Sequence, residues 1–182
     1  MDIENEYLIK ISEGDTAAFD ALFILHYPRV KNFVAGLVKN EEDARDLSQD
    51  IFLKIWNNRE KLPKIKYFKT YLFQMSKNAV FDFFRQNAIF ENDDTDNKYR
   101  IEDYNSLEEI VEARDLEMLI DTLVETMPEQ RKKIYKMSRK EGLTNEEISI
   151  RLNLSKRTVE THISNTLKEI KKMLTSILLF FH

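Results

Sequence analysis

The chain has no cysteine, and this absence excludes disulfide bonds, cysteine zinc clusters and thiol catalysis. Glycine and proline are also scarce, with three of each among 182 residues. Because 42% of the residues are hydrophobic and turn-forming residues are few, we expect an all-α protein. A chain of this length accommodates one domain or two small ones.

Targeting segments and long hydrophobic runs are absent as well. Residues 1–11 carry acids where a signal peptide needs a cationic start and an apolar run, so we expect a cytoplasmic protein. The apolar end, Leu174–His182, is too short to span a bilayer. We expect it to continue the last helix and pack on its own domain; a tail that contacts a partner or a membrane surface is the alternative.

No pattern in the chain resembles a catalytic site. The three histidines are scattered, and no glycine-rich phosphate loop is present. Asp93, Asp94 and Asp96 lack the glycine and terminal glutamate of a calcium loop. We therefore expect no enzyme activity, no metal, no cofactor and no small-molecule substrate.

The net charge of −4 conceals an uneven distribution along the chain. Residues 1–86 are neutral overall, residues 87–129 carry 3 basic and 14 acidic side chains, and residues 130–182 carry 12 basic and 5 acidic ones. The basic charge therefore lies in the C-terminal part, as a nucleic-acid-binding surface requires. Residues 87–105 are polar, acidic and aperiodic, which predicts a flexible linker between domains at 1–86 and 106–182.

Hydrophobic periodicity and capping residues predict the helices. Before the linker we expect helices at Asn5–Ser12, at Asp15–Val38 with an interruption near Pro28, at Asn40–Asn58 and at Phe68–Gln86, with a loop at Arg59–Tyr67. After it we expect helices at Ser106–Glu125 and Glu129–Lys140, followed by a helix-turn-helix.

The helix-turn-helix occupies residues 143–172. Thr144 and Glu147 form the pattern of a capping box at the start of its first helix. Asn153 stands where the turn needs a left-handed residue, and Ser155 can cap the second helix. The expected buried stripe of that helix is Val159, Ile163, Leu167 and Ile170. The opposite face presents Lys156, Arg157, Glu160, Thr161, Ser164 and Lys168, short or positive side chains suited to a major groove and its phosphates.

The helix at 40–58 also has two faces. Ala44, Leu47, Ile51 and Ile55 form a buried stripe at helical spacing. The far side lines up Asp43, Asp46, Asp50 and Leu53, flanked by Gln49. An acidic ridge with one exposed leucine suits docking on a basic partner helix. An ordinary solvated face is the alternative.

The segment from Arg59 to Arg85 is basic, with seven basic and two acidic residues. Its expected core face consists of Tyr71, Leu72, Met75, Ala79 and Phe83. Lys77, Phe81, Phe84 and Arg85 fall toward the other side. Exposed aromatics beside cations bind unstacked single-stranded bases. The alternative is that both phenylalanines pack against neighbouring helices.

Two stretches together resemble a known family. DARDLSQDIFLKIW (Asp43–Trp56), followed by FKTYLFQMSKNAVFDFFRQ (Phe68–Gln86), resembles the core-binding and promoter-melting regions of bacterial RNA polymerase sigma factors. The most similar group is the extracytoplasmic-function (ECF) group. Residues 126–170 look like the C-terminal promoter-binding domain of the same family.

The resemblance implies roles for individual residues. The residues implied to dock on a coiled coil of the polymerase large subunit are Asp46, Gln49, Asp50 and Phe52, to which the acidic ridge adds Asp43 and Leu53. Lys77 and Asn78 match the motif beside a pocket for a flipped promoter base, and the segment 59–67 matches the specificity loop. The full set of candidates for promoter opening is Arg59, Lys61, Lys64, Lys66, Lys77, Asn78, Phe81 and Arg85. The candidates for duplex recognition are Ser155, Lys156, Arg157, Thr158, Glu160, Thr161, His162, Ser164 and Lys168.

The implied protein is a non-catalytic sigma factor that binds core RNA polymerase and promoter DNA and is restrained by an anti-sigma partner. Two other functions remain open at this point. The helix-turn-helix is also similar to that of response-regulator and quorum-sensing transcription factors, which act without docking on polymerase. That reading predicts an upstream domain with strands, and the N-terminal half shows no strand pattern. The last alternative is a helical adaptor without a DNA function, which the net charge of +7 over residues 130–182 argues against.

Overall fold

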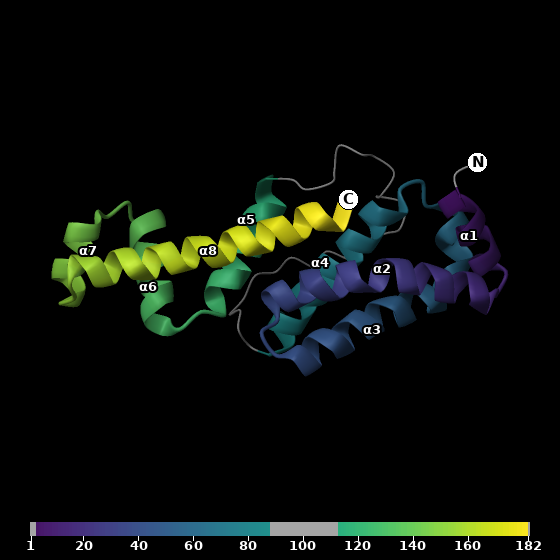
Figure 1. Cartoon of the computed structure of the whole chain (residues 1–182), viewed down its shortest axis with the longest axis horizontal. Coiled ribbons are helices and arrows are strands. Elements are labelled where there is room, and N and C mark those ends of the chain that lie inside the picture. The colour runs from purple at the N-terminus through teal and green to yellow at the C-terminus, as the bar shows by residue number, and fades with distance from the viewer. Residues whose placement is uncertain (1–2, 88–112, 182) are drawn as a thin grey trace.

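A computed structural model describes residues 3–87 and 113–181 of the chain. Within these two ranges every regular element is a helix, which confirms the all-α prediction. The molecule is elongated: a helical bundle forms one end, the helix-turn-helix forms the other, and one long helix connects them (Figure 1).

Five elements build the N-terminal half. They are α1 (Ile3–Ser12), α2 (Thr16–Leu37), α3 (Glu41–Asn57), the 3-10 helix η1 (Arg59–Lys64) and α4 (Phe68–Gln86). The predicted interruption at Pro28 is wrong, since α2 runs through this residue. Pro28 lies on the exposed side of α2, where water can satisfy the carbonyl that the proline leaves without a donor. The expectation of a loop at 59–67 is also wrong for most of its length, because residues 59–64 form η1.

Helices α2 and α3 pack side by side in opposite directions through aromatic pairs. Phe19 contacts Trp56 with ring centroids 5.0 Å apart, and Phe23 contacts Phe52 at 4.9 Å. Asn40 caps α3 as predicted: its side-chain oxygen accepts hydrogen bonds from the backbone N–H groups of Glu42 and Asp43. The outer face of α3 is thereby held in a fixed direction.

Four helices build the described part of the C-terminal half. They are α5 (Ala113–Glu125), α6 (Glu129–Arg139), α7 (Asn145–Leu152) and α8 (Lys156–Phe181). The predicted linker, apart from Asn87, and the first part of the helix predicted at 106–125 lie outside the described residues. A small core of Ile134, Met137, Ile148 and Val159 joins α6, α7 and the start of α8.

Helix α8 corrects two of the expectations. Leu167 is exposed, and Thr166 is buried in its place, because the buried positions of α8 follow a repeat of alternating four and three residues from Thr166 onward. The C-terminal segment does continue the last helix, but it packs on the N-terminal half rather than on its own domain. Phe180 lies against Phe33 and Phe73, with ring centroids 6.0 and 5.4 Å apart.

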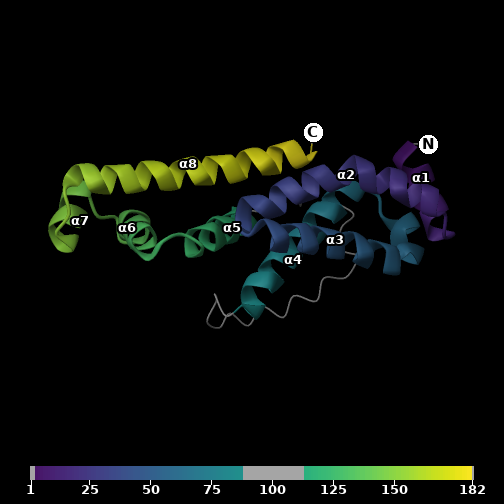
Figure 2. The same ribbon diagram turned by 60° about the horizontal axis from the view of Figure 1, so that its bottom comes forward.

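The two halves share one hydrophobic core. Helix α8 runs alongside α2 in the opposite direction (Figure 2), with Ser176 beside Gly36 and Glu169 within 3.7 Å of Lys39. Leu119, Leu123 and Val124 of α5 belong to the same core. Among the described helices, none combines the length and the hydropathy that crossing a membrane requires.

Candidate functional site

The outer face of α3 carries the predicted acidic ridge. Asp46, Gln49 and Asp50 are exposed, and Leu53 keeps 57% of its surface accessible. Asp50 makes no ion pair with any other described residue, and Asp46 meets only the exposed guanidinium of Arg45 at 3.5 Å. The ridge therefore presents exposed carboxylates around one apolar side chain, and that of Asp50 has no counter-charge among the described residues.

Phe52 does not lie on this face. It is 2% exposed and packs against Phe23 and Tyr27 of α2. Residues 52 and 53 are neighbours in sequence, but a helix turns by about 100° per residue, so only one of them can face outward here. Phe52 packs on the buried side of α3, so the expectation that it lies on the docking surface is wrong.

The segment from η1 into α4 presents basic side chains on the surface. Lys61, Lys64 and Lys66 are exposed, and the Lys66 ammonium lies 5.2 Å from the ring centre of Tyr67. Arg59 is half-buried, with its guanidinium over the ring of Trp56 at 4.8 Å. This cation–π contact anchors one end of η1 to α3.

Helix α4 is more deeply covered than its sequence indicates. Phe84 is buried and Phe81 is half-buried, so the packed alternative holds for these two aromatics. Lys77 is only 2% exposed, and its Nζ donates to Asp115 Oδ2 of α5 at 2.5 Å. The expectation that Lys77 is exposed is therefore wrong, because its side chain is buried in the folded chain and pairs with a carboxylate of α5.

Asn78, the neighbour of Lys77, is half-buried, and its Oδ1 is sealed from solvent with no hydrogen-bond partner in the part of the chain that the structure describes. Arg85 remains exposed and pairs with Asp82 at 3.3 Å. Among the candidates for promoter opening, the lysines of η1 and its flank and Arg85 are thus exposed, Arg59 and Phe81 are half-buried, and Lys77 and the Oδ1 of Asn78 are covered. Sequence reasoning missed Asp115, because no local pattern connects it with a lysine 38 residues away.

The turn of the helix-turn-helix has the predicted geometry. Thr144 and Glu147 form a reciprocal capping box, and Asn153 adopts the left-handed conformation with φ of 52°. Hydrogen bonds from the backbone N–H and the hydroxyl of Thr144 hold the pKa of Glu147 below its usual value. The hydroxyl of Ser155 accepts from the N–H of Thr158 at 3.0 Å and caps α8.

The first turns of α8 present the recognition surface. Arg157, Glu160, Thr161, Ser164 and Lys168 are exposed on it. Lys156 is exposed too and pairs with Glu146 of α7 at 3.3 Å. Ser155 and Thr158, two of the candidates for duplex recognition, also stabilise the start of α8, because their hydroxyls are hydrogen-bonded to each other at 2.8 Å. His162 is half-buried, and its Nδ1 has no hydrogen-bond partner among the described residues.

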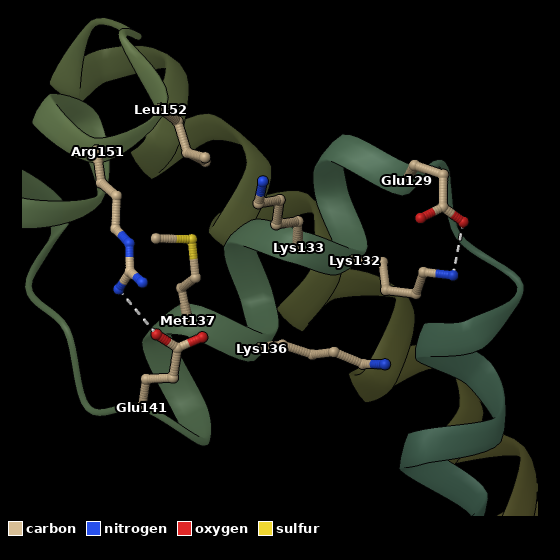
Figure 3. A pocket seen from close by; sticks show the side chains of 8 residues that line it. All are labelled: Glu129, Lys132, Lys133, Lys136, Met137, Glu141, Arg151 and Leu152. Atoms are coloured by element: carbon tan, nitrogen blue, oxygen red, sulfur yellow. Dashed lines mark hydrogen bonds and ion pairs between the residues drawn. The ribbon is translucent and has the colours of Figure 1, made fainter.

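A basic hollow of about 500 Å³ lies between α6 and α7 (Figure 3). Its lining residues are Glu129, Lys132, Lys133, Lys136, Met137, Glu141, Arg151 and Leu152. Glu125 of α5 pairs with Lys132 and Lys136 at its edge. Burial alone raises the pKa of Glu125, but the hydrogen bonds from Lys136 and Lys132 outweigh it and lower the pKa. Most of the positive charge in the hollow is therefore already neutralised.

Comparison with known proteins gives matches over both halves. Residues 22–89 match the model of sigma-70 region 2, and residues 117–170 match that of sigma-70 region 4. A probable RNA polymerase sigma factor of Haemophilus influenzae is 25% identical over 159 residues, covering 78% of this chain and 82% of the relative. The ferric citrate uptake sigma factor FecI of Escherichia coli is 26% identical over 158 residues, covering 82% and 87%.

Two further proteins are similar over nearly the whole chain. The RNA polymerase sigma-H factor of Pseudomonas aeruginosa is 20% identical over 188 residues, covering 96% of this chain and 95% of the relative. The solved structure of CnrH in complex with the cytosolic domain of CnrY is 17% identical, with a TM-score of 0.43 over 96% of this chain and 99% of that one.

Proposed function

Because this chain belongs to the sigma-70 family, in its ECF group, we propose that its two halves divide the work of transcription initiation. The protein is a sigma factor that binds core RNA polymerase and directs promoter-specific initiation. In the proposal, residues 1–86 dock on core polymerase and open the promoter, and residues 106–182 hold duplex promoter DNA. The observation that carries it is the match to region 2 followed by region 4 in one chain.

We assign the docking step to the outer face of α3. Its members in the proposal are Asp43, Asp46, Gln49, Asp50 and Leu53. Charge on the ridge steers the encounter with a basic helix, and burial of Leu53 supplies affinity at the centre. The support is the exposure of Leu53 amid carboxylates that are largely unpaired within the described chain.

The docking face is tested by neutralising its two central carboxylates. We expect the variant with Asp46→Asn and Asp50→Asn to bind purified core polymerase at least about tenfold more weakly, with the larger loss at low salt. Fluorescence anisotropy of the labelled full chain measures this. Glu13→Gln, which removes an exposed charge at the end of α1, is the matched control. Equal affinities for the double variant and the control count against the assignment.

We assign promoter contacts to two surfaces. Lys61, Lys64 and Lys66 on η1 and its flank, with Arg59, Lys77, Asn78, Phe81 and Arg85, are the proposed contacts to melted DNA. The exposed first turns of α8 are the proposed contacts to the duplex, where a good base contact contributes about 1–3 kcal/mol of discrimination. The support is the exposure of the η1 lysines and of Arg157, Thr161 and Lys168 on one face of α8.

Sigma factors are non-catalytic initiation factors, and we propose that this chain likewise catalyses nothing itself. We place it in the cytoplasm, where core polymerase works. We also propose an anti-sigma protein as a partner, because the resemblance to the ECF group implies one. The proposal predicts that such a partner covers the α3 ridge or the α8 recognition face.

A further inference from the structure

We propose that Glu160 of α8 determines promoter specificity: its carboxylate reads a cytosine in the duplex element by accepting a hydrogen bond from the amino group of that base. This inference rests on the proposed function of α8 in duplex recognition. It deepens that function by naming the base that this part of the recognition surface selects.

The first support is the position of Glu160 on α8. The helix begins at Lys156, so residue 160 lies in its second turn. In a helix-turn-helix protein, the residues near the N-terminus of the recognition helix contact the edges of the bases. Glu160 is exposed, as are Arg157 one turn before it and Ser164 one turn after it. Its side chain therefore belongs to the face that meets the major groove.

The second support is that Glu160 makes no ion pair with another described residue, although two cations lie within reach along the helix. Lys156 and Arg157 precede it by four and three residues, and side chains at these spacings are neighbours on a helix surface. Lys156 pairs instead with Glu146 of α7 at 3.3 Å. Arg157 also forms no ion pair among the described residues. The carboxylate is thus available to a ligand, and no ion pair ties it to the fold.

The third support is the small size of the side chains around Glu160. The hydroxyl of Thr161 donates to the backbone oxygen of Arg157 at 2.8 Å, so it is turned back onto the helix. Ser164, one turn further along, is exposed and ends at its own hydroxyl. Glu160 is longer than either of these neighbours. Its carboxylate can therefore reach a base edge without obstruction from them.

The chemistry of a carboxylate selects cytosine among the four bases. An ionised carboxylate only accepts hydrogen bonds, so it needs a base that presents a donor. In the major groove, the donors are the amino groups of cytosine and adenine, whereas guanine and thymine present acceptors. Adenine also places its N7 acceptor beside the amino group, and this lone pair repels a carboxylate. Cytosine is therefore the base that Glu160 fits.

The same carboxylate disfavours the other bases. Arg157 and Lys168 are exposed on this surface and suit the phosphates of any DNA sequence. An acid between them loses its hydration when DNA binds, and only a donor from a base replaces that hydration. Sequences without an amino group at this position are therefore bound more weakly, which adds a repulsive element to the recognition surface.

Selection from a duplex library tests the proposal. The full chain is combined with purified core polymerase, and the promoter fragments that it retains from a library with a randomised upstream element are sequenced. We expect one position to prefer cytosine on one strand by at least about fivefold. Glu160→Ala should lose the preference at this position alone, and Glu160→Gln should change it to adenine, because an amide side chain matches adenine N6 and N7. Glu117→Gln, which removes an exposed acid of α5, is the matched control and should select the parent sequence.

A modified base tests the hydrogen bond itself. N4-methylcytosine at the selected position keeps the base pair but replaces the amino hydrogen in the major groove by a methyl group. We expect the affinity of the parent complex to fall at least about fivefold and that of Glu160→Ala to stay unchanged. An equal loss in both complexes, or a loss in neither, overturns the proposal.

Two results of the selection distinguish the inference from the function on which it rests. If Glu160→Ala binds all sequences more tightly and selects the parent sequence, the carboxylate only repels phosphate and the proposal is overturned. If the parent chain with core polymerase selects no upstream sequence at all, the proposed function itself is contradicted, and the role of Glu160 falls with it.

Discussion

Phe180 lies at the centre of the contact between the end of α8 and the N-terminal half, with 1% of its surface exposed. Replacing it by alanine removes a fully buried ring, its two aromatic contacts with the N-terminal half and a third with Phe181. Substitutions of this type cost about 3–5 kcal/mol. The lower end applies here, since Phe180 lies in the last turn of α8, whose surroundings can partly collapse. A cost of about 3 kcal/mol shifts the balance between docked and undocked α8 by roughly 150-fold.

Amide hydrogen exchange over residues 171–181 measures this shift, because the undocked end of α8 exposes its backbone hydrogen bonds to water. We expect exchange about a hundredfold faster in Phe180→Ala than in the parent chain. Leu179→Ala is the matched control. The side chain of Leu179, next to Phe180 in the sequence, is 62% exposed, so its loss should cost less than about 0.5 kcal/mol. Identical exchange in the two variants refutes the packing described for α8.

Two further predictions concern the helix-turn-helix. Thr144→Ala removes the capping box of α7 and should lower stability by about 1 kcal/mol in thermal denaturation, whereas Thr175→Ala on the exposed side of α8 should not. The pKa of Glu147 in the folded chain lies below its unfolded value, so this capping contribution is present at neutral pH and is lost as the pH falls through the folded pKa. The stability difference between the parent and Thr144→Ala should therefore shrink in acid, and a difference that is constant with pH contradicts the role of Glu147. Arg157→Ala should weaken binding to duplex promoter DNA by about 5- to 100-fold in gel-shift titrations, and an unchanged affinity removes Arg157 from the recognition surface.

The parts of the structure that depend on neighbouring residues could be predicted from the sequence. The caps at Asn40, Thr144 and Ser155 and the left-handed turn at Asn153 are all present, because each depends on a hydrogen bond or a backbone angle within three residues. The position of α4 was likewise predicted to the residue. Local hydrophobic spacing and capping chemistry suffice for such features.

The parts that depend on distant contacts could not be predicted. Lys77 has the pattern of an exposed cation on α4, but in the folded chain it is buried and pairs with Asp115, 38 residues further along the sequence. The C-terminal segment is apolar enough to pack on any available surface, and its sequence does not say that α2 and α4 supply it. Phe52 and Leu53 are both hydrophobic, and the direction of α3 relative to α2 decides which one faces outward.

In vitro transcription with purified core polymerase tests the central claim most directly. Core enzyme with the full chain should give discrete transcripts from a subset of promoters in a genomic DNA pool, and core enzyme alone should give none of them. The variant with Asp46→Asn and Asp50→Asn should lower their yield, whereas Glu13→Gln should not. Specific initiation that does not depend on the chain, or no specific initiation in its presence, contradicts the account.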